Sequence, residues 1–202
     1  NKNKEDFLIF CGKTGNNQNR DHHSRYHLLD RICKDFDIKC YSQEISKKEN
    51  KRLSKYNLIN LFFKKVAQKE IFLHDKYAEK IFNPVFGIEM YEKILSSYAV
   101  LNSHVDLNKI PINFSANMRL FETTGVGTAI FTEDSKNINE LFNKNQLIVY
   151  KNYEDLINKI KYYKSNLDEL IQIGKNGQDQ TLKFHTSKVR INEINQIIMN
   201  NL

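Results

Sequence analysis

The chain has 202 residues and a formal net charge of +7, with 40% hydrophobic and 27% charged residues. This apolar fraction is too high for a disordered chain, and seven glycines with two prolines exclude a collagen-like or linker-dominated protein. No run approaches the ~20 apolar residues that a membrane span requires. We therefore expect a soluble globular domain and, because the first residue is Asn1 rather than Met, a fragment or processed chain. Three cysteines at no metal-like spacing favour a reducing, cytoplasmic setting: Cys11, Cys33 and Cys40.

Three short elements are predicted at the start of the chain. Residues 7–11 (FLIFC) form a continuous apolar run that ends at Gly12, which is the pattern of a strand buried on both faces. Residues 23–36 repeat apolar side chains at helical spacing, and residues 38–41 fit a second strand. A strand, a helix and a strand within roughly 35 residues match the size of a βαβ unit.

The middle of the chain is less regular. Residues 42–52 are rich in Lys, Glu, Ser and Asn and predict a solvated loop, and residues 54–79 show a helical pattern without clear breaks. The segment Asn-Pro-Val-Phe-Gly at 83–87 opens a predicted helix, which is followed by a strand at 99–102. The apolar stripe of that helix comprises Ile88, Tyr91, Leu95 and Tyr98.

Strands and helices alternate again in the second half. A polar loop at 103–116 leads into a short helix at 117–124, which Gly125 and Gly127 end because glycine tolerates a positive φ. A strand, a short helix and a strand are then predicted at 128–132, 137–142 and 147–150.

Helices with N-terminal caps are predicted at the end of the chain. Asn152 with Asp155 and Asn166 with Glu169 have the spacing of a capping box, and Thr186 opens the last helix. One face of the first helix is apolar: Tyr153, Leu156, Ile157, Ile160 and Tyr163. The side chains of the last helix that are expected to point inward are Val189, Ile194, Ile197 and Ile198.

This alternation predicts a parallel sheet covered by helices on both faces. Crossover connections between parallel strands are right-handed, so we expect an α/β, Rossmann-like fold with residues 1–202 as a single domain. Ligands bind such sheets beyond the carboxyl ends of the strands. The loops at those ends are residues 12–24, 103–117 and 133–136.

The predicted helix start near residue 117 is a candidate anion site. Free N–H groups at a helix N-terminus favour phosphate, while Ser115 and Asn117 are equally good capping residues, and the two roles are compatible. Gly12-x-x-Gly15 lacks the Lys-Ser/Thr ending of a P-loop and the three glycines of a dinucleotide fingerprint. The six histidines show no metal-ligand spacing, so neither a metal nor a cofactor is predicted.

Residues 117–130 carry the most informative pattern. Glu122 precedes Gly125, Gly127 and an apolar strand, a placement from which a carboxylate can bind both hydroxyls of a ribose. The same carboxylate has the i, i+3 spacing of an exposed ion pair with Arg119. Spacing alone favours the ion pair.

This segment resembles the donor-binding stretch of group 1 glycosyltransferases with the GT-B fold, especially the CgeB-like (spore maturation) group. The pattern Asn-x-Arg-x-Phe-Glu followed by glycines carries the resemblance, at Asn117, Arg119, Phe121, Glu122, Gly125 and Gly127. Residues 84–91 and 100–104 resemble the stretch that precedes the donor loop in that group. Further similar positions lie near both ends of the chain: Phe10, Cys11, Gly12, His23, Arg25, Gly174, Gly177, His185, Thr186 and Arg190.

The resemblance implies a single GT-B half-domain with C-terminal helices that binds a nucleotide-sugar. Glu122 would then bind the ribose, and the loop and helix start at Ser115 and Asn117 would face the diphosphate. Arg119 or Arg25 would add positive charge, although Arg25 can equally be a solvated helix residue. The other implied binding residues are Gly12 and His104, the latter with an ordinary loop histidine as its alternative.

Two departures from the family pattern bear on activity. Counting back from Glu122 places Phe114 where many retaining relatives carry the first glutamate of Glu-x7-Glu. GT-B enzymes also have two Rossmann-like domains, and this chain resembles only the C-terminal, donor-binding one. A separate or deleted N-terminal acceptor domain is therefore expected, and no catalytic residue is assigned.

The resemblance implies a metal-independent, hexosyltransferase-like enzyme whose acceptor is a glycan, a lipid or a protein. Its expected location is the cytoplasm, with possible contact with the inner face of the membrane. The alternative is a non-catalytic basic module that keeps the fold and binds a partner or an anionic membrane. Specific nucleic-acid binding is the weakest reading, since only the charge suggests it.

Overall fold

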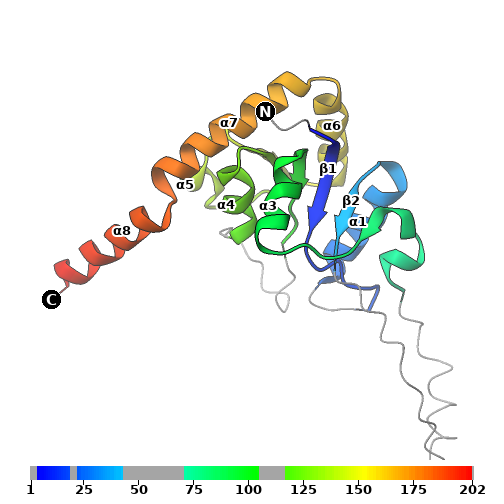
Figure 1. The fold of residues 1–202 in the computed structure, drawn as a ribbon, viewed down its shortest axis with the longest axis horizontal. Coiled ribbons are helices and arrows are strands. Elements are labelled where there is room, and N and C mark those ends of the chain that lie inside the picture. Colours follow the sequence, from blue (N-terminus) through cyan, green and yellow to red (C-terminus); the bar gives the residue numbers. More distant parts are fainter. Residues whose placement is uncertain (1–3, 19–21, 43–70, 105–116, 202) are drawn as a thin grey trace, which may run out of the picture.

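The computed structural model describes residues 4–18, 22–42, 71–104 and 117–201. Within these ranges six strands form one parallel sheet in the order β3-β2-β1-β4-β5-β6 (Figure 1). This order, with helices between the strands, makes the fold Rossmann-like α/β, as predicted. The strands are β1 (Asp6–Cys11), β2 (Lys39–Tyr41), β3 (Ile81–Phe82), β4 (Ser97–Leu101), β5 (Ala129–Glu133) and β6 (Ile148–Tyr150).

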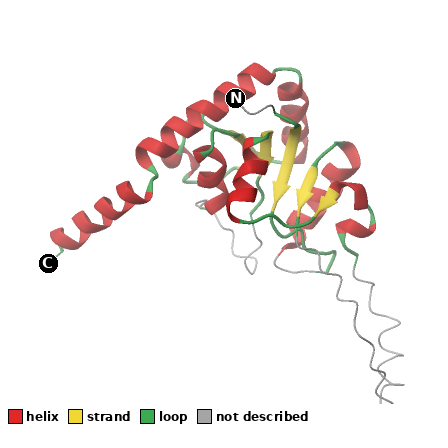
Figure 2. Ribbon diagram, viewed as in Figure 1, coloured by secondary structure: helices red, strands yellow, loops and turns green. Residues whose placement is uncertain are grey.

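Helices cover both faces of the sheet (Figure 2). Leu8 and Phe10 of β1 belong to a core cluster with α1, α6 and the start of α7, whereas Ile9 and Cys11 face α3. A third cluster packs α4 and α5 against β5 and β6. The apolar run of β1 is therefore buried on both faces, as predicted. The helices are α1 (His23–Asp35), α3 (Gly87–Leu95), α4 (Met118–Gly125), α5 (Ile138–Leu141), α6 (Tyr153–Lys164), α7 (Leu167–Phe184) and α8 (Ser187–Asn200).

Most predicted elements are confirmed, with ends that shift by one to three residues, and the exception is the connection from β2 to β3. The helical pattern predicted at 54–79 falls mainly outside the described residues. Its described end contains two short 3-10 turns, η2 (Leu73–Asp75) and η3 (Ala78–Lys80), and the two-residue strand β3 follows them. Strand β3 was not predicted because two residues give no periodicity. Of the predicted loops at 42–52 and 103–116, all but residues 42, 103 and 104 also lie outside the described residues.

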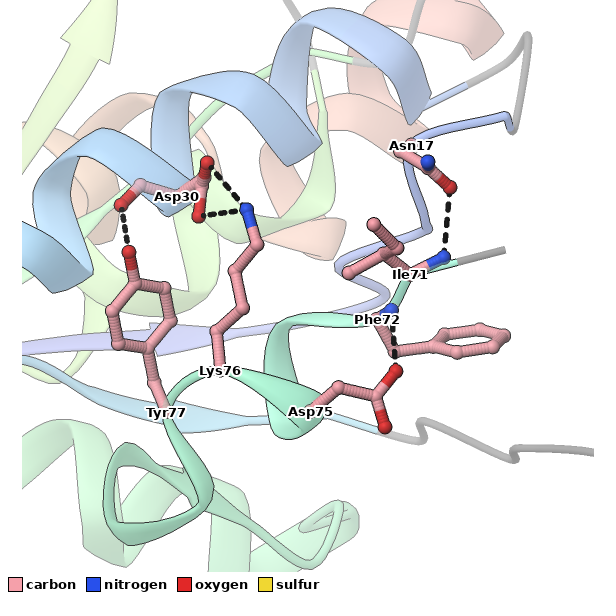
Figure 3. A network of polar contacts seen from close by, with 7 residues as sticks. All are labelled: Asn17, Asp30, Ile71, Phe72, Asp75, Lys76 and Tyr77. Carbon is pink, nitrogen blue, oxygen red and sulfur yellow. Dashed lines mark hydrogen bonds and ion pairs between the residues drawn. The ribbon is translucent and has the colours of Figure 1, made fainter. Parts of the chain in front are cut away.

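Polar contacts hold residues 71–77 against the loop after β1 and against α1 (Figure 3). The Ile71 N–H donates to Asn17 Oδ1 over 2.8 Å, and the Asn17 N–H donates to the Ile71 carbonyl over 3.2 Å. The Lys76 ammonium lies 3.0 Å from each carboxylate oxygen of Asp30, while the Tyr77 hydroxyl donates to the Asp30 carbonyl. The chain therefore enters β3 from a defined position beside the β1 loop.

The predicted inward face of α3 is wrong. Met90 and Ile94 are the buried residues of this helix, whereas Ile88 is 79% exposed. Tyr91 and Leu95 lie on the exposed side as well. Two adjacent stripes have helical spacing in this helix, and contact with Ile9 and Val100 of the sheet selects the one that carries Met90.

The last three helices confirm some predictions and correct others. The α6 face is confirmed, because Leu156 and Ile160 are buried. Asn152 caps α6 by accepting from the Asp155 N–H, but Asn166 donates its side-chain amide to the Tyr162 carbonyl and does not cap α7.

Helix α8 begins after a Thr186 cap, as predicted, but its predicted inward face is wrong. None of its described residues is buried, and Ile194 and Ile197 are 55% and 63% exposed. In Figure 1 the helix extends away from the sheet and its covering helices. Periodicity identifies the side chains that share a face, but not whether the same chain covers that face. Among the residues that the structure describes, no helix combines the length and apolarity needed to span a membrane.

Two glycines let α7 approach the backbone closely. A Cβ on Gly174 would lie 2.5 Å from the Gly127 carbonyl oxygen and 3.0 Å from the Ala129 nitrogen. A Cβ on Gly177 would lie 2.5 Å from the Gln146 carbonyl oxygen. Gly127 itself has φ of 78° and ends the turn after α4, as predicted. The connection between α4 and β5 is therefore held directly beneath α7.

Candidate functional site

The carboxyl ends of β1 and β4 lie side by side where the strand order changes direction. Strands β2 and β3 follow β1 to one side, and β4, β5 and β6 lie on the other (Figure 1). Open parallel sheets bind ligands at such a switch point. The residues that follow β1 and β4, together with the last residue of β5, form the candidate site.

The loop after β1 is fixed to the end of β2. Gly12 donates its N–H to the Tyr41 carbonyl, and the buried Thr14 hydroxyl lies 3.2 Å from Ser42 Oγ. Gly15 has φ of 76°, and a Cβ there would lie 2.7 Å from the His22 Cβ, so this position requires glycine. Gly12 is thus at the site edge, where it was predicted.

Arg25 joins the two loops at the switch point. Its Nη2 donates to the Ser103 carbonyl oxygen over 2.6 Å, and its Nη1 donates to the Lys13 carbonyl oxygen over 3.1 Å. The side chain is buried, with the guanidinium 5.8 Å from the centre of the Phe10 ring. The alternative of a solvated helix residue is therefore wrong. Arg25 instead places positive charge beneath the β1 and β4 loops.

Asn117 connects the start of α4 to the end of β4. Its Oδ1 accepts from the Leu120 N–H over 3.1 Å, which confirms the predicted cap. Its Nδ2 donates to Asn102 Oδ1 over 3.1 Å and lies 3.3 Å from His104 Nδ1. The other predicted residue of this helix start, Ser115, lies outside the described residues.

Arg119 and Glu122 form the ion pair that their spacing predicts. Arg119 Nη1 lies 3.0 Å from Glu122 Oε2, but the two side chains are only 19% and 16% exposed, so the pair is not a solvated surface pair. Burial raises the pKa of the Cys11 thiol to about 11, and the charges of Arg119 and Glu122 also act on it, in opposite directions. The pair therefore lies close to the carboxyl end of β1.

Glu133, the last residue of β5, is a site residue that the sequence analysis did not identify. Its Oε1 accepts from the Ser103 hydroxyl over 3.0 Å, and its Oε2 accepts from the His104 N–H over 2.9 Å. An acidic residue directly after a predicted apolar strand was the available signal. Its two partners in the loop after β4 could not be read from the sequence.

The described part of the chain brings six of the seven predicted site residues to this edge or to the start of α4: Gly12, Arg25, His104, Asn117, Arg119 and Glu122. Backbone N–H groups, a buried guanidinium and a half-buried carboxylate converge there. Such groups can bind a phosphate and a diol. Among the described residues, no group of three or more His, Cys, Asp or Glu side chains is arranged to hold a metal ion.

Comparison with known proteins supports a relation to glycosyltransferases. The sequence profile of a family described as glycosyl transferase-like matches residues 48–196. The structure is similar to sucrose-phosphate synthase from Thermosynechococcus elongatus, with a TM-score of 0.63, 10% identity and coverage of 97% of this chain and 45% of that one. No curated protein sequence matches the chain significantly.

Two further solved structures show the same fold. HepE from Anabaena, in complex with UDP-glucose, has a TM-score of 0.61 and 11% identity, with 98% of this chain and 50% of that chain covered. A glycosyltransferase from Rickettsia africae has a TM-score of 0.60 and 15% identity, with 95% and 46% covered. The chain thus spans half or less of the length of each of these three proteins.

Proposed function

The chain belongs to the glycosyl transferase-like family, and on that premise we propose that it is the nucleotide-sugar-binding half of a GT-B glycosyltransferase. The proposal rests mainly on one observation: the start of α4, the Arg119–Glu122 pair and the end of β1 lie together at the switch point of the sheet. A nucleotide-sugar offers a ribose diol and a diphosphate, which are the two chemical groups that these residues suit.

In this proposal Glu122 accepts hydrogen bonds from both ribose hydroxyls, and Arg119 orients the Glu122 carboxylate. The first N–H groups of α4 face the diphosphate. Because the departing nucleoside diphosphate gains negative charge, these fixed dipoles and the nearby Arg25 guanidinium would stabilise the leaving group. The UDP-glucose complex of HepE supports a nucleotide-sugar as the ligand class.

The finer assignments extend this proposal. We infer a CgeB-like, hexosyltransferase-like enzyme that needs no metal or cofactor and transfers its sugar to a glycan, a lipid or a protein. A second domain outside these 202 residues would supply the acceptor site. The uncovered apolar side of α8 supports such a neighbour, as does the partial coverage of the structural relatives. The cytoplasmic location stays a prediction, with three buried free cysteines in its favour.

The test measures thermal unfolding with UDP, GDP, CDP and TDP for the wild type and for Glu122→Ala. A nucleotide at about 100 times its dissociation constant adds about 2.7 kcal/mol. For a domain of this size that raises the melting temperature by roughly 5 to 10 °C. We expect one nucleotide to stabilise the wild type and to act much more weakly on Glu122→Ala.

The matched control is Glu154→Ala, which removes a carboxylate that is 73% exposed on α6, on the opposite face of the sheet. It should respond to the nucleotide as the wild type does. If none of the four nucleotides shifts the wild type, the donor-site proposal fails. A basic binding module for a partner or an anionic membrane would then be the leading account of the fold.

A further inference from the structure

The orientation of the Asn117 amide is fixed by its neighbours. Its oxygen accepts from the Leu120 N–H, so its nitrogen must be the atom that faces Asn102 Oδ1 and His104 Nδ1. The Asn102 amide is oriented in turn, because its Oδ1 must face the Asn117 N–H donor, which leaves its Nδ2 to donate to Thr132 Oγ1 over 2.9 Å. An amide N–H therefore points toward the imidazole.

This amide determines the tautomer of His104. An amide N–H can only donate, so His104 Nδ1 must be the acceptor across the 3.3 Å contact. In a neutral imidazole the proton then lies on Nε2. Nε2 is buried and has no hydrogen-bond partner among the residues that the structure describes. Leaving a buried donor without an acceptor is costly, so an acceptor is expected opposite it.

Burial of the ring keeps it neutral. Burial lowers the pKa of His104, the Glu133 carboxylate opposes this by raising it, and the Arg25 guanidinium lowers it. Tyr150 of β6 lies near the same Glu133 and Arg25 side chains, and burial holds the pKa of its hydroxyl well above the usual value. His104 is therefore neutral at physiological pH, with a single N–H to donate.

The backbone of His104 is fixed separately from its ring. Glu133 accepts from the Ser103 hydroxyl and from the His104 N–H, and Arg25 donates to the Ser103 carbonyl. A carboxylate on β5 and a guanidinium on α1 thus hold Ser103 and His104 in the loop after β4. The ring has little freedom to turn, since Asn117 holds one edge.

We propose that the neutral His104 imidazole donates its Nε2–H to a diphosphate oxygen of the bound nucleotide, with Asn117 selecting the tautomer and Glu133 positioning the loop. This inference rests on the proposed function. A phosphate oxygen is favoured over a sugar hydroxyl because the N-terminus of α4 and Arg25 carry positive charge, while both oxygens of the adjoining Glu133 carboxylate already accept from the Ser103 hydroxyl and the His104 N–H. Asn117 and Glu133 are positioning residues in this arrangement.

The tautomer can be tested without any ligand. A long-range ¹H–¹⁵N spectrum of ¹⁵N-histidine-labelled protein should show the His104 proton on Nε2. Asn117→Asp keeps a capping oxygen but replaces the amide donor with an acceptor, so the proton should move to Nδ1 and the pKa of the ring should rise. Asn152→Asp, the same change at the α6 cap, should leave the His104 signals in place. A proton on Nδ1 in the wild type would overturn the tautomer assignment.

Binding is then tested by titration calorimetry with UDP and UDP-glucose as probes. Gln can place an N–H near the position of Nε2, whereas Leu cannot. We therefore expect His104→Gln to bind UDP within about threefold of the wild type and His104→Leu to bind about tenfold more weakly or worse. Glu133→Gln can satisfy one of its two donors and should bind about three- to tenfold more weakly. Asp134→Asn makes the same charge change at the exposed neighbouring residue and should bind like the wild type.

The outcomes separate this inference from the proposed function. One outcome would overturn the inference and leave the proposed function in place. In that outcome UDP binds the wild type, Glu122→Ala weakens the binding, and His104→Leu leaves the affinity unchanged. A loss for UDP-glucose without a loss for UDP would assign the acceptor to the sugar and overturn the diphosphate contact. If the wild type binds none of UDP, GDP, CDP and TDP, both the proposed function and the ligand contact are overturned. The spectrum would still decide the tautomer of His104.

Discussion

Replacing Gly174 with alanine tests how tightly α7 is packed against the connection between α4 and β5. The added Cβ would lie 2.5 Å from the Gly127 carbonyl oxygen, whereas close C···O contacts in proteins are about 3.3 Å. Helix α7 or that connection must therefore move by roughly 0.8 Å. Both neighbouring groups are backbone, so no side chain can turn aside. Overpacking of a core costs about 1 to 3 kcal/mol, and this contact belongs at the upper end of that range.

Gly125→Ala is the matched control, because a Cβ on this last residue of α4 meets only the Thr181 Cγ2 at an ordinary 3.7 Å. Alanine favours helix over glycine by about 1 kcal/mol in both variants, so the propensity gain largely cancels in the comparison. We expect Gly174→Ala to be about 3 kcal/mol less stable than Gly125→Ala in urea unfolding followed by circular dichroism. Equal unfolding midpoints with unchanged slopes would refute the steric reasoning.

Two further expectations concern a helix cap and the thiols. Asn117→Ala should lower the free energy of unfolding by roughly 2 to 3 kcal/mol, against about 1 for Asn152→Ala, because Asn152 caps an exposed helix start while Asn117 also contacts the buried Asn102 and the half-buried His104. Urea midpoints measure both, and equal losses would contradict the contacts described for Asn117. At pH 8 a thiol reagent should find no reactive group among Cys11, Cys33 and Cys40 in the native protein, because all three are buried and the pKa of Cys11 is raised to about 11. Reaction of the thiols with a chromogenic reagent before the protein unfolds would contradict that burial.

The sheet was predictable because its buried strands are continuous apolar runs, whereas the helices between them alternate apolar and polar side chains. Continuous apolar runs such as residues 7–11 leave little choice of structure, and glycine marks the end of α4 at Gly125 and Gly127. Two kinds of prediction were wrong: which of two stripes of a helix faces the sheet, and whether an apolar face is covered at all. Two stripes of α3 had helical spacing, and only contact with β1 and β4 selects Met90. The exposed face of α8 has the same pattern as a buried one.

The candidate site divides in the same way. Local pairs such as Arg119 with Glu122, and the Asn117 cap, follow from spacing on one helix, so the sequence could predict them. Glu133 on β5 accepts from the His104 N–H in the loop after β4, and Arg25 donates to carbonyls of two different loops. Such contacts depend on which strands are neighbours, and that information comes only with the strand order.

The central place of β1 also constrains the order in which the chain can fold. Ile9 pairs with Lys39 on one side and with Val100 on the other, so β1 cannot complete its pairing until residues much later in the sequence have been made. Parallel pairings of this range are slow to form, because distant segments must meet before any contact rewards them. During synthesis residues 7–11 would stay exposed until β4 has emerged, which makes this short segment the natural target of a chaperone and of aggregation. Refolding should accordingly be limited by the docking of β4 onto β1.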